Sequence, residues 1–164
     1  MNASMNTNDV DTRWMLVSVG AHEFAIDIAP VREVRGFTEP VFLPQAPHYV
    51  RGLLDLRGAV IPLVDIADQL GLPPITTTES SVVVVVEHAG KVTGLLVDQV
   101  LDLLAVPLEF QQPVGGADRL RRCIAGSAIL NEHILHLIAL DNLLAWREDE
   151  PAPAFDSVQE SVGT

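Results

Sequence analysis

The stretch YVRGLLDLRGAVIPLVD, from Tyr49 to Asp65, predicts a β-hairpin. One apolar strand ends in Leu56-Arg57-Gly58, and a second strand returns from this turn toward Asp65. Arg57 therefore stands between apolar segments, where an unpaired charge would be costly if it were buried. The sequence predicts that Arg57 has either an acidic partner or a role at the surface.

A second copy of this pattern lies downstream. When Val50 is aligned with Ile124, the apolar positions of the two hairpins coincide without a gap. Further upstream, a slightly smaller offset aligns Phe24 with Thr93. This agreement in order and spacing predicts two similar β modules in one chain.

The modules are predicted at residues 12–72 and 80–147, joined by a Pro- and Thr-rich linker over residues 73–80. Each module has about five short strands, closely spaced turn signals and a helical turn after its last strand, a pattern typical of a small closed barrel. Residues 1–11 are polar without periodicity and predict disorder, and residues 148–164 predict an acidic tail. The expected fold is mainly β, with two barrels packed side by side.

Two short helices and one buried strand are predicted inside this framework. Asp65 should cap a helix over residues 66–70, and Asp141 should cap a closing helix that begins at Asn142. The five consecutive valines that begin at Val82 predict a strand buried on both faces, because β-branched residues favour strands.

The composition limits the classes of function. The chain has 164 residues, is 48% hydrophobic and carries a formal net charge of −12. Nucleic acid is not expected as a partner, because phosphate binding needs a positive surface, and Arg119, Arg121 and Arg122 are interpreted as a solvated loop. The single cysteine, Cys123, cannot form an internal disulfide, which fits a reducing cytoplasm. We find neither a signal-peptide pattern nor a membrane-spanning apolar run of about 18 residues.

Motifs of common enzymes are not found. The chain has no phosphate-binding glycine loop and no GxSxG elbow. His133 and His136 would form a metal pair only on a helix, whereas the surrounding ILHLIAL favours a strand, in which residues at an odd spacing face opposite sides. Cys123 is a weak nucleophile candidate because the sequence offers no obvious base for it. We therefore expect no catalysis, no metal and no cofactor.

Glu33 and Arg57 are the strongest candidates for a functional pair. They carry opposite charges and come from strands of the same predicted module. If the pair were buried, loss of one partner would be strongly destabilising, whereas an exposed pair would contribute little to stability. An ion pair that closes the barrel and a contact with a partner protein both remain open.

Four blocks of the sequence carry a family resemblance: FAIDIAPVREVRG (24–36), YVRGLLDLRGAVIPLVDI (49–66), KVTGLLVDQVLDL (91–103) and AGSAILNEHILHLIALDNLL (125–144). Together they resemble the chemotaxis coupling proteins, the CheW-like family. The family commonly has Asn before the LRG turn, where this chain has Asp55, and this departure leaves the detail of the turn open.

The resemblance implies two SH3-like five-stranded β-barrels without enzymatic activity. It implies an adaptor or scaffold of two-component signal transduction, joining the cytoplasmic tip of methyl-accepting chemoreceptors to a CheA-like histidine kinase. The expected location is the cytoplasm, at receptor arrays on the inner membrane and without membrane insertion. A stand-alone β-barrel that binds a small ligand, and an adaptor of a related motility pathway, are the alternatives.

The resemblance also implies a set of partner-binding residues when the family positions are carried over one by one. These residues are Val31, Glu33, Val34, Gly52, Arg57, Gly94, Val100 and Gly126. We expect the three valines to lie along one cleft between the modules that accepts an amphipathic receptor helix. Burial of Val31 and Val100 in the core is the competing interpretation.

Overall fold

The computed structural model describes residues 13–105, 122–130 and 132–145. Within these ranges the chain forms ten strands and two helices of four residues each. The strands are β1 (Arg13–Val19), β2 (His22–Asp27), β3 (Val31–Gly36), β4 (Val50–Leu56), β5 (Ala59–Asp65), β6 (Val82–His88), β7 (Lys91–Val97), β8 (Gln99–Ala105), β9 (Ile124–Leu130) and β10 (His133–Ile138). The helices are α2 (Ile66–Gln69), after β5, and α4 (Leu140–Leu143), after β10.

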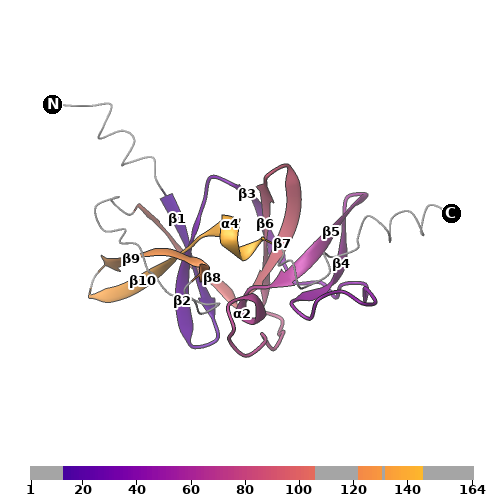
Figure 1. Cartoon of the computed structure of the whole chain (residues 1–164), viewed down its shortest axis with the longest axis horizontal. Coiled ribbons are helices and arrows are strands. Elements are labelled where there is room, and N and C mark those ends of the chain that lie inside the picture. Colours follow the sequence, from indigo (N-terminus) through magenta and orange to yellow (C-terminus); the bar gives the residue numbers. More distant parts are fainter. Residues whose placement is uncertain (1–12, 106–121, 131, 146–164) are drawn as a thin grey trace.

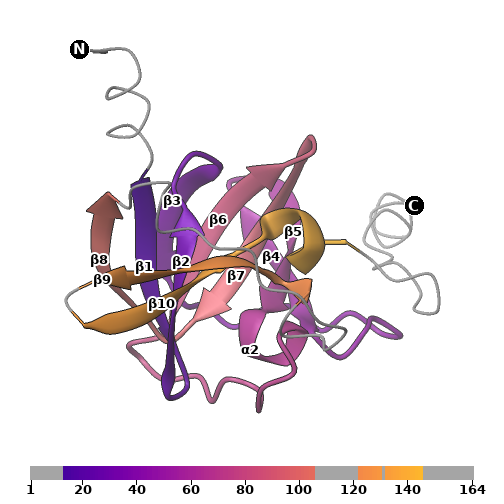
Figure 2. The ribbon, with the colours of Figure 1, turned by 60° about the vertical axis from the view of Figure 1, so that its left-hand side comes forward.

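The strands form two five-stranded sheets that lie side by side along the long axis of the molecule (Figure 1). We call them sheet A, with the strand order β8-β1-β2-β10-β9, and sheet B, with the order β3-β6-β7-β5-β4. This arrangement confirms the predicted mainly β fold, with two five-stranded units and a short helix after the last strand of each copy. Figure 2 shows the same two groups of strands from the side.

The two sheets do not coincide with the two halves of the sequence. Sheet A combines the first hairpin, β1–β2, with β8, β9 and β10, whereas sheet B combines β3, β4 and β5 with the hairpin β6–β7. The predicted division into barrels over residues 12–72 and 80–147 therefore needs correction, because each sheet takes strands from both sides of residues 73–80. Parallel pairing of β10 with β2, and of β5 with β7, joins the exchanged parts.

The register of the sheets confirms the sequence repeat. Leu63 lies opposite Gly94, and the residues that the repeat aligns with these two, Leu137 and Ala25, lie opposite each other. Register shifts between paired strands recur at positions that the repeat aligns. The shift in the β3–β6 pair matches the one in β1–β8, and the shift in β4–β5 matches the one in β9–β10. The chain is thus a pseudo-symmetric pair of modules that exchange their first hairpins.

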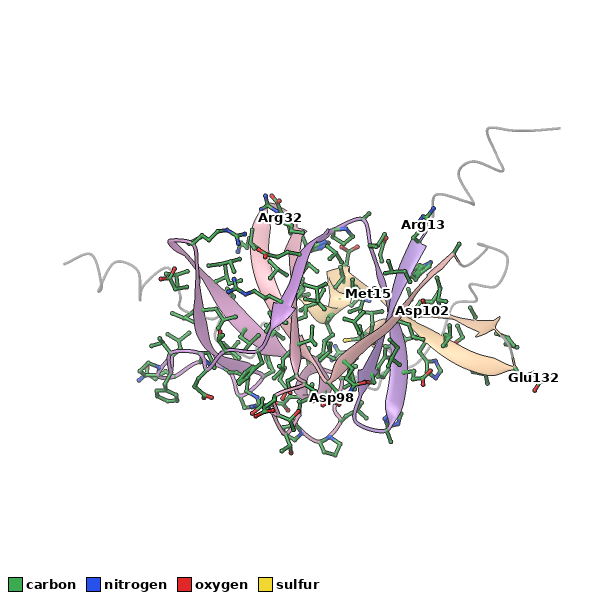
Figure 3. All side chains as sticks on the ribbon, turned by 180° about the vertical axis from the view of Figure 1, so that it is seen from behind. Arg13, Met15, Arg32, Asp98, Asp102 and Glu132 are labelled. Carbon is green, nitrogen blue, oxygen red and sulfur yellow. The ribbon has the colours of Figure 1, made fainter. Side chains whose placement is uncertain are left out.

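One hydrophobic core joins the two sheets. Met15, Val17 and Phe24 of sheet A belong to the same buried cluster as Val84 and Leu95 of sheet B. Met15 lies in the middle of the molecule among side chains from both sheets (Figure 3). Valines 83–86 are all buried, which confirms that β6 is covered on both faces.

The predicted helix cap at Asp65 is confirmed, and the predicted cap at Asp141 is wrong. The Asp65 Oδ1 atom accepts hydrogen bonds from the N–H groups of Ala67 (2.9 Å) and Asp68 (3.3 Å), as an N-cap should. The helix α4, in contrast, begins at Leu140 after Ala139, and no side chain caps it. Asp141 lies in its first turn, where an acidic group still favours the helix dipole.

Asp65 has a second role that the sequence pattern did not predict. Its side chain is 0% exposed, and Oδ2 accepts hydrogen bonds from Arg51 Nε (3.1 Å), an Arg51 terminal nitrogen (2.7 Å) and the Ile75 N–H (3.0 Å). Arg51 also donates to the Ile75 carbonyl. One carboxylate therefore holds β4, the start of α2 and the segment that leaves for β6.

We predict that Asp65→Ala lowers the free energy of unfolding by roughly 3–5 kcal/mol, because it leaves the Arg51 charge partly buried without its partner. Urea denaturation followed by circular dichroism measures this loss. Asp141→Ala, at the exposed first turn of α4, is the matched control and should cost about 1 kcal/mol or less. Equal losses in both variants would contradict the role of the buried carboxylate.

Candidate functional site

Arg57 lies in the two-residue turn between β4 and β5. It has a φ of 55°, and Gly58 has a φ of 91°, which corresponds to the turn type that matches the twist of a hairpin. The Asp55 Oδ1 atom accepts a hydrogen bond from the Gly58 N–H at 2.9 Å, so a carboxylate here does what an Asn side chain would do. The Arg57 side chain is 73% exposed, so it lies at the surface and is not buried between the two strands.

Glu33 is the acidic partner of Arg57, as predicted. An Arg57 terminal nitrogen lies 2.6 Å from Glu33 Oε2. Glu33 belongs to β3 and Arg57 to the β4–β5 hairpin, and β3 and β4 are the two edges of sheet B. Val41, which follows β3, also exchanges two backbone hydrogen bonds of 2.8 Å with Leu53 of β4. The ion pair thus spans the seam at which sheet B closes on itself.

The electrostatic environment of Glu33 is positive in a chain that is acidic overall. The hydrogen bond from Arg57 is the main cause of a Glu33 pKa below its ordinary value, and the charges of Arg57, Arg35 and Arg32 act in the same direction. Arg32 pairs with Glu87 at 3.1 Å and lies at the outer end of β3 (Figure 3). The surface around Glu33 is therefore a local cluster of arginines.

The three glycines of the predicted site lie inside the sheets. Gly52 has a φ of 148°, and a Cβ atom there would be 2.4 Å from the Val41 carbonyl oxygen. A side chain at Gly94 would press on Val83 at 3.0 Å, and Gly126 is buried opposite Leu137. Because glycine has no side chain, neighbouring atoms can approach the strand closely at these positions. For the same reason, these residues present no side chain to a partner protein.

The predicted valines lie on the edge strands β3 and β8, which belong to different sheets and do not pair with each other. Val31 and Val100 are partly buried against the common core, and Val34 is 44% exposed. Val31 and Val100 thus pack against the core, as the competing interpretation expects, and each also keeps some exposed surface that a partner could contact. Three cavities among the described residues are lined by other side chains. One shared cleft between the valines stays a prediction.

Sequence reasoning missed several exposed apolar side chains. They are Val41, Phe42, Leu101, Leu103, Ile129 and Ile134. A signal was available for Val41 and Phe42, because apolar residues between Pro40 and Pro44 cannot belong to a long strand. Leu101 and Leu103 lie on β8, an edge strand of sheet A.

The remaining candidates do not form a reaction centre in the part of the chain that is described. His133 and His136 lie in β10, a strand, so the helical spacing that a metal pair needs does not occur. Cys123 is buried. Arg119 and Arg121 fall outside the described residues, and Arg122 is exposed. In residues 13–105, 122–130 and 132–145 no helix is long and apolar enough to cross a membrane.

Two β units that exchange strands, with paired charges and exposed apolar side chains at their edges, have the surfaces that a protein-interaction scaffold needs. The sequence pattern of the CheW-like domain matches residues 13–148, and the chain belongs to this family. It is 36% identical to the probable chemotaxis protein CheW of Rhizobium etli over 92% of this chain and 98% of the relative. It is 35% identical to the chemotaxis protein CheW of Rhizobium meliloti over 92% and 99% of the respective chains.

A solved structure shares the fold. The scaffolding protein TtCheW from Thermoanaerobacter tengcongensis superposes with a TM-score of 0.77 at 23% identity, covering 85% of this chain and 91% of its own. Membership of this family makes the chain a chemotaxis scaffold or adaptor and not an enzyme.

We predict that Arg57→Ala raises the pKa of Glu33 toward its ordinary value, because the main hydrogen bond that stabilises the carboxylate is lost. In the native chain this pair favours the folded state above the ordinary carboxyl pKa, and its contribution disappears as the pH falls through the lowered value. NMR titration of the Glu33 side chain measures the change. Arg13→Ala, at a distant exposed arginine, should leave the titration unchanged, and an unchanged titration in Arg57→Ala would contradict the pairing.

Proposed function

We propose that this chain is a non-enzymatic adaptor that couples chemoreceptors to a CheA-like histidine kinase in chemotaxis signal transduction. Membership of the CheW-like family supports the class of function. The observation that carries the proposal is the exposed Glu33–Arg57 pair, which stands at positions that the family resemblance assigns to receptor coupling. The partners are the kinase and the cytoplasmic tip of a methyl-accepting receptor, in arrays at the inner membrane.

The proposed mechanism needs no chemistry from the chain itself. An adaptor that holds a receptor and a kinase together raises the effective concentration of each for the other and restricts their relative geometry. Two pseudo-symmetric sheets suit this task, because they offer similar edge strands in two directions with different side chains on each.

The receptor surface is proposed around β3 and the β4–β5 turn. Val34 supplies an exposed apolar side chain, and Arg32, Arg35 and Arg57 supply positive charge close to Glu33. An amphipathic helix with apolar anchors and acidic flanks would complement such a surface. The contact would be small and reversible, about 1,200 Å² or less in total.

Reconstitution tests the function directly. Receptor fragments and kinase are assembled with and without this chain, and kinase autophosphorylation is measured. The chain should raise the receptor-coupled output and show no activity alone. Output that does not change when the chain is omitted would overturn the proposal.

Arg57→Ala should reduce receptor-coupled output, and Glu33→Ala should reduce it in the same way, because each variant breaks one ion pair. The double variant should then lose less than the sum of the two single variants in receptor binding, since partners in one interaction are not independent. Strict additivity would show that the two residues act separately.

Val34→Glu should weaken receptor binding while kinase binding and the melting temperature stay close to those of the native chain, because Val34 is largely exposed and the new charge would meet an apolar helix. Val100→Glu tests the second edge strand, and its melting temperature is followed in parallel. Loss of both partners together with a lowered melting temperature would identify Val100 as a core residue.

A further inference from the structure

The described structure consists of two halves that a single segment connects. The N-terminal half, residues 13–71, holds β1 to β5 with α2, and the C-terminal half, which begins at residue 82, holds β6 to β10 with α4. The chain passes between the halves once, through residues 72–81. The other contacts that join the halves are non-covalent, so halves from two separate chains could form them as well.

The two halves depend on each other for their sheets and for their core. Of the eight strand pairs in the described ranges, four join one half to the other, namely β1–β8, β2–β10, β3–β6 and β5–β7. Sheet A takes two strands from the N-terminal half and three from the C-terminal half, and sheet B takes three and two. The common core draws on both halves. Each half therefore needs the strands of another half to bury its apolar residues.

The halves meet in the way that the subunits of a two-fold dimer meet. The alignment that sets Val50 on Ile124 also sets Gln69 of α2 on Leu143 of α4, and the Gln69 Nε2 atom donates a hydrogen bond to the Leu143 carbonyl at 2.7 Å. Contact between equivalent positions is expected where the axis of an isologous interface passes. Both residues are buried, so this contact belongs to the interior of the joined halves.

The first part of the connecting segment is fixed to the N-terminal half. Ile75 is buried, its N–H donates to Asp65 Oδ2 at 3.0 Å, and its carbonyl accepts a hydrogen bond from Arg51. The repeat aligns Arg51 and Asp65 with Ala125 and Ala139, so the second copy lacks this pair. The chain up to Ile75 is therefore held in place by residues of its own half.

Residues 76–80, which we call the hinge, are the part of the segment that can take another course. They read TTTES, and all of them except Thr77 are exposed. Their hydrogen bonds within the described structure lie inside one local turn, in which Thr78 N–H donates to Ser81 Oγ at 2.8 Å and Ser81 N–H donates to the Thr78 carbonyl at 3.1 Å. Beyond the turn, the buried Ser81 is fixed because its carbonyl accepts the Phe37 N–H. A short polar segment between two fixed ends suits the exchange of domains between chains.

We propose that a second copy of this chain is a binding partner, and that the two copies bind by exchanging halves at the hinge. The N-terminal half of each copy completes its sheets with the C-terminal half of the other copy, so the contacts between halves are kept and only the course of the hinge changes. Glu33 and Arg57 belong to the same half, so the dimer carries two complete Glu33–Arg57 pairs. It presents the edge surface of sheet B twice.

Concentration and hinge length decide between the monomer and the exchanged dimer. The halves of one chain meet at the effective concentration that the hinge sets, which is on the order of millimolar for a short flexible linker. A hinge too short to span the two ends within one chain removes the monomer as a competitor. Exchange requires that four strand pairs and the common core open first, so it takes place during refolding and is slow in the folded chain.

Deletion of Thr77, Thr78 and Glu79 tests the exchange, because it shortens the connection by up to about 10 Å. Size-exclusion chromatography with light scattering should give twice the mass of the native chain, with an unchanged circular dichroism spectrum. The matched control inserts Gly-Ser-Gly between Thr76 and Thr77 and should stay monomeric in dilute solution. The native chain, refolded at about 1 mM, should give a dimer that refolding in dilute solution does not give. Monomers alone in both the deletion variant and the concentrated native chain would overturn the proposal.

Cleavage of the hinge distinguishes an exchanged dimer from a dimer that is joined through its surface. Residues 76–80 are replaced by a protease recognition sequence, and the dimer obtained by concentrated refolding is isolated and cut. An exchanged dimer should fall to particles of monomer mass that keep the folded spectrum, because only the two hinges link its two folded units. A dimer that keeps its mass after complete cleavage would overturn the proposal.

The same cut in the monomer tests whether the halves hold together without the hinge. The cut monomer should keep its mass and its circular dichroism spectrum, because four strand pairs and the common core join its halves. Separation of the two halves would contradict the proposal. These readouts involve neither receptor nor kinase, so their failure is independent of the proposed coupling function.

Discussion

The exchange of the first hairpin between the two halves is the constraint on which the rest of the structure depends. Neither half of the chain can complete a sheet alone, because β2 pairs with β10 and β7 pairs with β5. The strands β3 and β8 must then cross from one sheet to the other, and each becomes an edge strand of the sheet that it joins. The common core follows from this crossing, and two modules of modest size gain the burial of one larger domain.

A symmetric backbone here carries different chemistry in its two copies. The seam of sheet B has the Glu33–Arg57 pair, and Arg51 near the start of β4 pairs with the buried Asp65 at the end of β5. The second copy has Asp102 in place of Glu33 and two alanines in place of the buried pair. An adaptor that must hold two different partners benefits from this difference, because similar surfaces with similar charges would compete for the same partner.

Much of the candidate site could be predicted because it depends on local patterns. Opposite charges on neighbouring segments indicated the Glu33–Arg57 pair, and the two-residue turn after Leu56 indicated the hairpin. The role of Gly52 could not be read in this way, since the close approach of the Val41 carbonyl is a tertiary contact. The partner of Asp65 was missed for a similar reason. A cap at the start of α2 explained the residue, and nothing in the spacing showed that Arg51 would reach the same carboxylate.

The sequence by itself determined the strands other than β8, the repeat and its offsets, and the cap at Asp65, because apolar periodicity and turn residues act over a few positions. Only the tertiary structure decided which copy each hairpin would join. The repeat makes the internal pairing and the exchanged pairing nearly equivalent in register, so an alignment cannot distinguish them. The tertiary structure also decided that Arg57 is exposed. Exposure depends on what the rest of the chain packs against a residue, and that is not a local property.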